Sequence, residues 1–117
     1  MPGPQSEAQH LVVDVTIAGG AELVAAVAGK AIRVLGYLLV ATANVEAVFN
    51  SNDNGTTPVI TPLSGPLSLV TARHVEANFN PVGWFQTLAG EALDLSLGGT
   101  GATPDGDVGG HLVYVLV

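Results

Sequence analysis

The longest uninterrupted apolar stretch of the chain, residues 22–49, is the feature that most constrains its fold. It reads ELVAAVAGKAIRVLGYLLVATANVEAVF. Its alanines suit a helix, but the many β-branched residues, the glycines Gly29 and Gly36 and the absence of helix caps favour strands. We therefore predict three successive strands, over residues 22–28, 31–41 and 44–49.

The middle strand of this block, residues 31–41, is apolar on both faces. Simple alternation assigns its side chains to two sets, with Ile32, Val34, Leu38 and Val40 on one face and Arg33, Leu35, Tyr37 and Leu39 on the other. A strand with two apolar faces is typical of the centre of a covered sheet. We expect this strand to be central and covered on both sides.

The rest of the chain alternates short apolar runs with glycine, proline and asparagine turns. These runs predict further strands at residues 10–18, 59–61, 66–70, 73–79, 91–97 and 111–117. In the first of them Leu11, Val13, Val15 and Ile17 share a face, and in 73–79 the inward residues are Val75, Ala77 and Phe79. Residues 98–110 are predicted to be a long glycine-rich loop. We expect Trp84 and Phe85, which follow a turn, to close one end of the core.

Eight or nine short strands without a helical period predict an all-β fold, an antiparallel β-sandwich. At 117 residues a jelly roll is favoured and an immunoglobulin-like sandwich is second. The sandwich occupies residues 10–117 as a single domain. Residues 1–9 form a flexible N-terminal arm, because its prolines oppose regular structure.

The chain carries few charges for its length. Charged residues make up 11% of it and hydrophobic residues 48%, whereas about 25% charged residues is usual. The surface of an isolated monomer would therefore expose many small apolar groups, and we infer an assembly that covers part of it. The net charge of −7 argues against nucleic acid or an anionic membrane as a partner.

Neither a leader nor a membrane span is recognisable in the sequence. The first residues, MPGPQSEAQ, lack a charged and then apolar pattern, and charges at Lys30, Arg33 and Glu46 interrupt the longest apolar run. We expect the protein to be made and used without crossing a membrane by the general secretory route.

No motif predicts an enzyme, a cofactor or a metal site. The three histidines, His10, His74 and His111, have no metal-binding spacing. Residues 50–55 mimic the opening of an EF-hand, but Thr61 stands where that loop needs a glutamate, so a turn is favoured. Asp105 and Asp107 are read as solvated loop charges in preference to a weak calcium site. There are no cysteines, and no nucleophile–base pair or phosphate loop is visible.

Five short motifs follow one another along the chain. They are VAAVAGKAIRVL at 24–35, LxGP at 63–66, FNPVGWF at 79–85, GEALDLSL at 90–97 and GGHLVYV at 109–115. Through them residues 24–117 resemble a family of small virion proteins of tailed bacteriophages. The resemblance implies a jelly-roll-like structural protein without catalytic residues. It implies either a trimeric capsid decoration (cement) protein or the base of a head or tail fibre.

We therefore expect a homotrimer that is made in the cytoplasm of a bacterial host, binds the major capsid protein and stabilises the capsid exterior. The alternative is a fibre or spike domain that binds a host receptor or glycan through its loops. The expected interface residues are Trp84, Phe85, Tyr37, Arg33, Arg73, His111 and Tyr114. The capsid-binding arm is expected to use Pro2, Pro4, Gln5 and Glu7.

Overall fold

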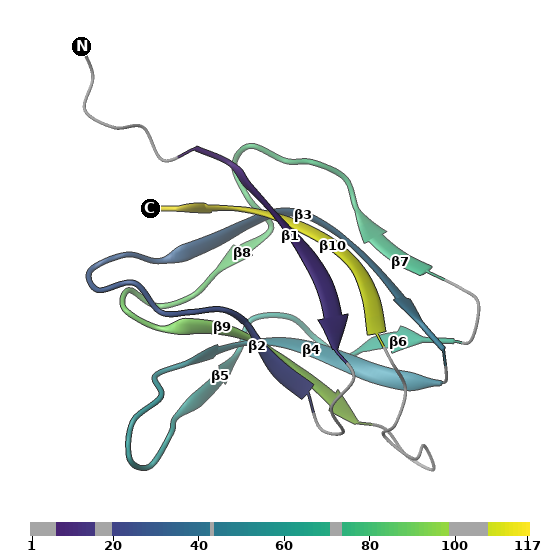
Figure 1. Cartoon of the computed structure of the whole chain (residues 1–117), viewed down its shortest axis with the longest axis horizontal. Helices are drawn as coiled ribbons and strands as arrows, with labels where there is room; N and C mark the ends of the chain where they lie inside the picture. The colour runs from purple at the N-terminus through teal and green to yellow at the C-terminus, as the bar shows by residue number, and fades with distance from the viewer. Residues whose placement is uncertain (1–6, 16–19, 43, 71–73, 99–107) are drawn as a thin grey trace.

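Two antiparallel sheets packed face to face make up the molecule (Figure 1). The computed structural model describes residues 7–15, 20–42, 44–70, 74–98 and 108–117, and these residues contain strands and turns but no helix. The strands are β1 (Gln9–Val15), β2 (Gly20–Val24), β3 (Ile32–Ala41), β4 (Val45–Asn52), β5 (Ile60–Pro62), β6 (Leu67–Leu69), β7 (His74–Ala77), β8 (Phe85–Gln86), β9 (Ala92–Gly98) and β10 (Val108–Leu116). The predicted all-β sandwich is confirmed.

The strand order is that of a jelly roll. One sheet, called here the β1 sheet, has the order β1-β10-β3-β7, with β8 also paired to β3. The other, the β2 sheet, has the order β2-β9-β4-β5, with β6 also paired to β4. The chain changes sheet at most steps but stays in the β2 sheet from β4 to β6 and in the β1 sheet from β7 to β8, and the last strand returns beside the first, as in the two Greek keys of a jelly roll.

In the described part of the chain, ten strand segments occupy eight positions, whereas eight or nine strands were expected. One position is shared by β5 and β6, which pair with opposite ends of β4, and another by β7 and β8, which do the same on β3. Proline explains both breaks, because its nitrogen cannot donate to a ladder. Pro62 and Pro66 flank the first break, and Pro81 lies in the second.

The inner faces of the sheets form one apolar core. Its largest fully buried side chains include Phe49, Ile32 and Leu95. The alternation predicted for the first strand is confirmed where the structure describes it, since Val13 is buried and Val12 is 70% exposed. Ile17 lies outside the described residues.

The alternation predicted for β3 is wrong after Val34. Tyr114 of β10 pairs with Val34 and Val113 pairs with Gly36, so Leu35 is an extra residue, a β-bulge. A one-residue bulge reverses every later side chain. Beyond the bulge, the core-facing residues are therefore Tyr37 and Leu39. Leu38 and Val40, which were expected to share a face with Val34, point outward instead.

The expectation that β3 is central is confirmed, because β10 pairs on one side and β7 and β8 on the other. The expectation that it is covered on both faces is wrong. Val40 is 39% exposed on the outer face. The apolar outer face of β3 is therefore open to solvent.

Other boundaries also differ from the predictions. The strand expected at residues 22–28 ends at Val24, and the one expected at 73–79 ends at Ala77, which leaves Phe79 62% exposed instead of inward. The predicted loop 98–110 is strand from Val108 onward. Gly110 has a φ of 138°, and a Cβ there would collide with the carbonyl oxygen of Leu38, so glycine permits the close approach of β10 to β3.

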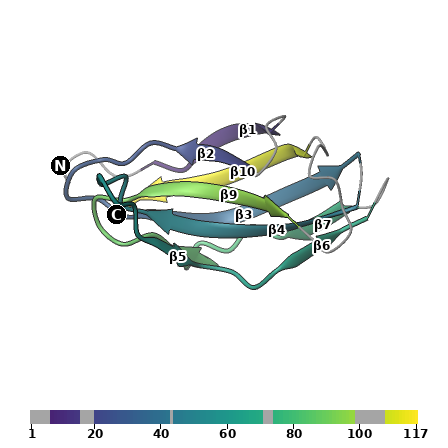
Figure 2. The same cartoon turned by 90° about the horizontal axis from the view of Figure 1, so that it is seen from below.

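The two sides of the sandwich have different edges (Figure 2). On one side β1 and β2 end their sheets, and on the other the broken strands β5 to β8 do so. This difference determines which edge of the molecule offers an unbroken strand.

Candidate functional site: the outer face of the β1 sheet

The outward side chains of the β1 sheet form three rows that cross the strands. The strand register determines which residues are neighbours in each row. The rows are Asp14, Gly109, Val40 and His74; Val12, His111, Leu38 and Glu76; and His10, Val113 and Gly36. Six of these positions are apolar or glycine, and the other five hold histidine, aspartate or glutamate.

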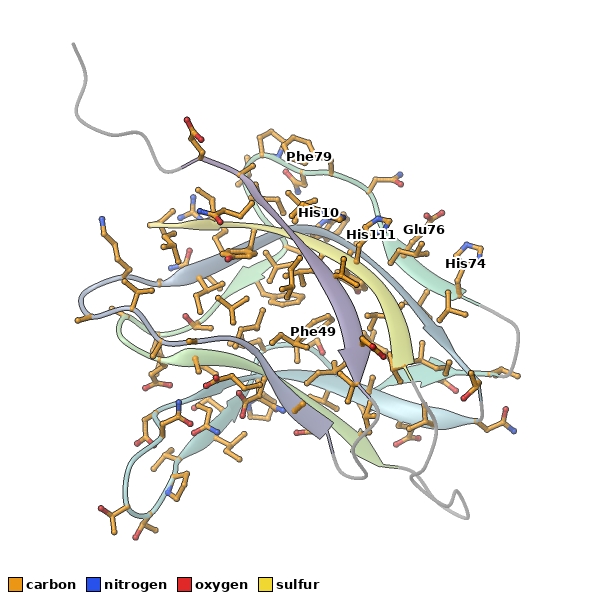
Figure 3. All side chains as sticks on the ribbon, viewed as in Figure 1. His10, Phe49, His74, Glu76, Phe79 and His111 are labelled. Atoms are coloured by element: carbon orange, nitrogen blue, oxygen red, sulfur yellow. The ribbon has the colours of Figure 1, made fainter. Side chains whose placement is uncertain are left out.

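All three histidines of the chain lie on this face. The rings of His10 and His111 have centroids 5.4 Å apart and are tilted by 44°. On β7, Nε2 of His74 lies 3.8 Å from Oε1 of Glu76, and both side chains are more than half exposed. Figure 3 shows the four side chains following one another across the sheet. The face therefore combines imidazoles and two carboxylates with apolar side chains.

A shallow hollow of about 250 Å³ lies over β3 on this face. Gly36 forms part of its lining. A side chain at this position would be crowded, because a Cβ there would lie 3.2 Å from the carbonyl oxygen of Ala77. The lining residues are Gly36, Tyr37, Leu38, Glu76, Ala77, Asn78, Phe79, His111 and Val113. The ring of Phe79 thus borders a depression that has both apolar and polar walls.

Residues 78–84, called here the edge turn, cover the bulge of β3. The backbone N–H of Asn80 donates to the carbonyl oxygen of Leu35 at 2.7 Å, and that of Trp84 donates to Val34 at 2.8 Å. These bonds attach the turn to β3 at the bulge residue and at the residue before it, so the turn lies between β7 and β8 along β3.

The edge turn is also closed internally. The N–H of Gly83 donates to the carbonyl oxygen of Asn80 at 2.9 Å, and the N–H of Val82 donates to Oδ1 of Asn80 at 3.0 Å. Nε1 of Trp84 donates to the carbonyl oxygen of Asn78 at 2.8 Å. Three large apolar side chains are presented by this ordered turn: Phe79, Val82 and Trp84, which are 62%, 77% and 51% exposed.

The expectation that Trp84 closes the core is therefore wrong, whereas its neighbour Phe85 does point inward. The ring of Phe85 lies 5.0 Å from that of Phe49, and the ring of Tyr37 lies 5.0 Å from Phe49. Burial raises the pKa of Tyr37 above its usual value. Adjacent residues of an extended strand face opposite ways, which explains why only one of the two aromatics is internal.

The other predicted interface residues are dispersed. Arg33 lies half-buried on β3, where its Nε donates to Oε1 of Gln86 at 2.9 Å. Tyr114 is half-buried against the core, so most of its ring is unavailable to a partner. Glu7 is exposed. Arg73, Pro2, Pro4 and Gln5 lie outside the described residues.

The outer face of the β2 sheet is chemically different. Its polar side chains bond to one another: Nδ2 of Asn50 donates to Oγ of Ser96 at 2.6 Å, and Nδ2 of Asn52 donates to Oδ2 of Asp94 at 2.6 Å. Nδ2 of Asn54 donates to Oε1 of Glu22 at 3.2 Å. Most of these polar groups are paired within the molecule, whereas Oδ1 of Asp94 is buried without a hydrogen-bond partner among the described residues.

The polar segment after Phe49 begins as strand and then turns. Asn50 and Asn52 belong to β4, and Asp53 closes the following turn by accepting hydrogen bonds from the N–H groups of Gly55 and Val59, each at 3.0 Å. These two bonds lower the pKa of the Asp53 carboxyl. The expected turn is thus found, beginning at Asp53.

In the described part of the chain, no three histidine, aspartate, glutamate or cysteine side chains gather in a metal-binding group. Asp105 and Asp107 lie outside it, so the structure does not test the loop where weak calcium binding was considered. The described residues also include no helix with the length and apolar character needed to span a membrane.

Sequence reasoning missed the residues that dominate this face. Val12, Phe79 and His10 were read singly, as an outward valine, an inward phenylalanine and a surface histidine. Only the strand order brings them to one face, because β1, β10 and β7 are far apart in sequence. The proline after Asn80 was the available signal that the strand stops before Phe79.

Comparison with known proteins does not identify a family. No protein-family model matches the chain, and no curated protein sequence does so. A solved structure of the infectious bursal disease virus Gx strain aligns with 94% of this chain and 32% of its own, at 11% identity and a TM-score of 0.42. The chain thus spans about a third of the length of that viral chain. A likeness at this level determines neither family nor function.

Proposed function

We propose that this protein is a non-enzymatic structural protein of a tailed-bacteriophage virion. In this proposal it is a homotrimeric decoration protein that binds the major capsid protein on the outside of the shell. The β1 sheet and its edge turn supply the contact surface. The β2 sheet faces solvent.

The observation that carries the proposal is the unpartnered apolar character of the β1 sheet side. The edge turn presents Phe79, Val82 and Trp84, and the adjoining face presents Val12 and Val40, all with more than a third of their area exposed. Large aromatic side chains held by an ordered turn are typical of the central contacts in protein interfaces. A patch of this kind is expected at an association surface.

The motifs behind the phage resemblance support the same assignment. FNPVGWF at 79–85 covers most of the edge turn and the first residue of β8, and GGHLVYV at 109–115 is most of β10 with His111. Two of the five motifs therefore coincide with the surface that the geometry favours. The low content of charged residues agrees with a protein whose surface is partly covered in its working state.

Decoration explains how such a surface would act. A protein that binds the assembled shell and not its free subunits stabilises the shell by its own binding free energy at each site. The edge turn would join copies into the trimer, and the outer face with its hollow would rest on the shell. The arm, residues 1–9, would add a second contact that becomes effectively intramolecular once the trimer has docked.

A fibre or spike domain is the second candidate, and the tip after β4 favours it. Asp53 orders this tip through Gly55 and Val59, and the tip exposes Val59 and Ile60. An ordered loop with exposed apolar residues is suited to receptor binding. The number of copies per virion separates the candidates: hundreds would support decoration, and a few tens or fewer would support a fibre.

Shell binding tests the proposal directly. Phage shells that lack the protein would be titrated with the wild type, with Phe79→Asp and with Val59→Asp. Phe79 and Val59 are 62% and 61% exposed, so the two variants place a carboxylate at positions of similar relative exposure. We expect Phe79→Asp to lose binding and Val59→Asp to retain it. The reverse result would support the fibre candidate, and equal binding by all three proteins would contradict the proposed surface.

The role of the arm is tested separately by deleting residues 1–8, which keeps Gln9 and its pairing with Tyr114 in β1. The truncated protein should melt at the same temperature and form the same oligomer as the full chain. It should bind shells more weakly, because the second contact is lost. Equal occupancy by both proteins would show that the arm makes no contact.

A further inference from the structure

The four edges of the two sheets differ in how well they are protected against pairing. Edges are usually blunted by proline, bulges, lysine or very short strands. The edges formed by β5 to β8 are short and interrupted by prolines. The edge strand β2 has five residues and a bulge between Glu22 and Val24.

The edge strand β1 has none of these features. All seven of its residues pair with β10 in continuous register, without a bulge. Its sequence, QHLVVDV, contains no proline and no lysine. Among the described residues, no strand pairs with its other side. The backbone groups along that side form a regular template for another extended strand.

We propose that β1 pairs antiparallel with β1 of a second copy, in the register centred on Val12. The β1 sheets of two molecules then become one continuous sheet about a two-fold axis. This contact is isologous, since each subunit supplies the same strand. It goes beyond the proposed function, because it requires neither a shell nor a trimer.

The outward side chains of β1 favour this register. Centring the pair on Val12 places His10 opposite Asp14 of the partner subunit, and Asp14 opposite the partner's His10. An imidazole N–H donates to a carboxylate in either protonation state, so both outer pairs are complementary. The two copies of Val12 meet at the axis. Each chain carries a charge of −7, but the carboxylate nearest the axis is matched with an imidazole.

The inward side chains agree with the same register. Leu11 lies opposite Val13 of the partner subunit, so the apolar core of one molecule continues into that of the other. Moving the centre to Leu11 or to Val13 shortens the ladder and leaves Asp14 without the imidazole. The register centred on Val12 is the one that uses every residue from Gln9 to Val15.

The pairing can be tested by disulfide trapping, because the chain contains no cysteine. Val12→Cys would be compared with Val59→Cys; the parent side chains are 70% and 61% exposed. Opposite residues of paired strands lie within disulfide reach. We expect Val12→Cys to form a covalent dimer about tenfold faster than Val59→Cys under mild oxidation, since pairing holds the two thiols together. Circular dichroism would verify that both variants are folded.

A mixing experiment tests the register. His10→Cys and Asp14→Cys protein would be combined in equal amounts and oxidised. The register centred on Val12 predicts that the mixed dimer outnumbers both self-dimers. Adding Val12→Lys to both chains should remove this preference, because two ammonium groups would meet at the axis. Equal trapping of Val12→Cys and Val59→Cys, or a majority of self-dimers in the mixture, would overturn the proposal.

Discussion

The outer faces of the β1 sheet and the β2 sheet rest on the same core, but their chemistry differs. On the β2 sheet the side chains of Asn50 and Asn52, and of Asn54 in the turn after β4, donate to neighbouring hydroxyl and carboxylate groups, so most of the polar side chains are paired within the chain. On the β1 sheet the outward positions hold valine, leucine and glycine together with three histidines and two carboxylates. We infer that the outer face of the β2 sheet contributes mainly to stability, and we propose the outer face of the β1 sheet for association.

The largest expected effect on stability concerns a feature that both sheets have, a glycine in close contact with a neighbouring strand. Gly110 in the β1 sheet and Gly20 in the β2 sheet both have positive φ, and a Cβ at either would collide with a neighbouring strand's carbonyl oxygen. Alanine at either position should cost about 3 kcal/mol or more in the free energy of unfolding, because strand contact and backbone are both strained. Urea denaturation would measure it.

Gly29→Ala is the matched control, because Gly29 also has positive φ but open space around it. It should cost only about 1–2 kcal/mol, the strain of a left-handed backbone. If Gly110→Ala were no more destabilising than Gly29→Ala, β10 would not approach β3 as closely as described.

The second prediction separates the two outer faces by stability. Asn50 is 3% exposed and donates to Ser96 Oγ and to the carbonyl oxygen of Val48. Asn50→Ala should cost about 1–3 kcal/mol, because buried acceptors lose their donor. Val12→Ala, on the other face, should change the unfolding free energy of the monomer by about 0.5 kcal/mol or less. Similar costs for both would remove the distinction between the faces.

The third prediction concerns the exposed tryptophan. Since about half of Trp84 is exposed, Trp84→Ala should change the free energy of unfolding by about 1 kcal/mol or less, well below the 3–5 kcal/mol of a buried tryptophan. It should instead weaken association between copies, as expected for an aromatic contact residue. Thermal melting and sedimentation velocity on the same samples would check both. A large loss of stability would place the indole inside the fold.

The smallest effect compares the two ordered turns. Asp53 closes the tip after β4 with a carboxylate, whereas Asn80 closes the edge turn with an amide. The folded pKa of Asp53 is lowered, so its contribution is present above the unfolded pKa of about 4 and is lost as pH falls through the folded pKa. NMR should show the amide protons of Gly55 and Val59 titrating in acid while that of Val82 does not. A shift at Val82 over the same pH range would contradict the assignment.

The sequence predicted the sandwich because alternation is a local property. In β1, Val13 and Val15 face the core as expected. The jelly-roll choice rested on strand number and length, and the observed strand order confirms it. The turn after β4 was also predictable, because Asp53 to Gly55 carries its own hydrogen-bonding chemistry.

The failures all involve contacts between strands. The bulge at Leu35 depends on how β10 and the edge turn pair with β3, so alternation alone placed Leu38 and Val40 on the wrong face. Gly109 and Gly110 look like loop residues until the neighbouring carbonyl of Leu38 is known. The candidate surface could not be predicted for the same reason, because His10, His74 and His111 become neighbours only through the sheet order.

The central claim is that association is carried by the β1 sheet side of the molecule. Sedimentation equilibrium at micromolar concentration tests it most directly, on the wild type, Phe79→Asp and Val59→Asp. We predict a mass of at least about 35 kDa for the wild type and for Val59→Asp, three times the 11.8 kDa of one chain, and β1 pairing between trimers would double it. We predict at most about 24 kDa for Phe79→Asp, the mass of the two copies that β1 pairing alone can join. A monomeric wild type, or a Phe79→Asp protein that associates as strongly as Val59→Asp, would contradict the account.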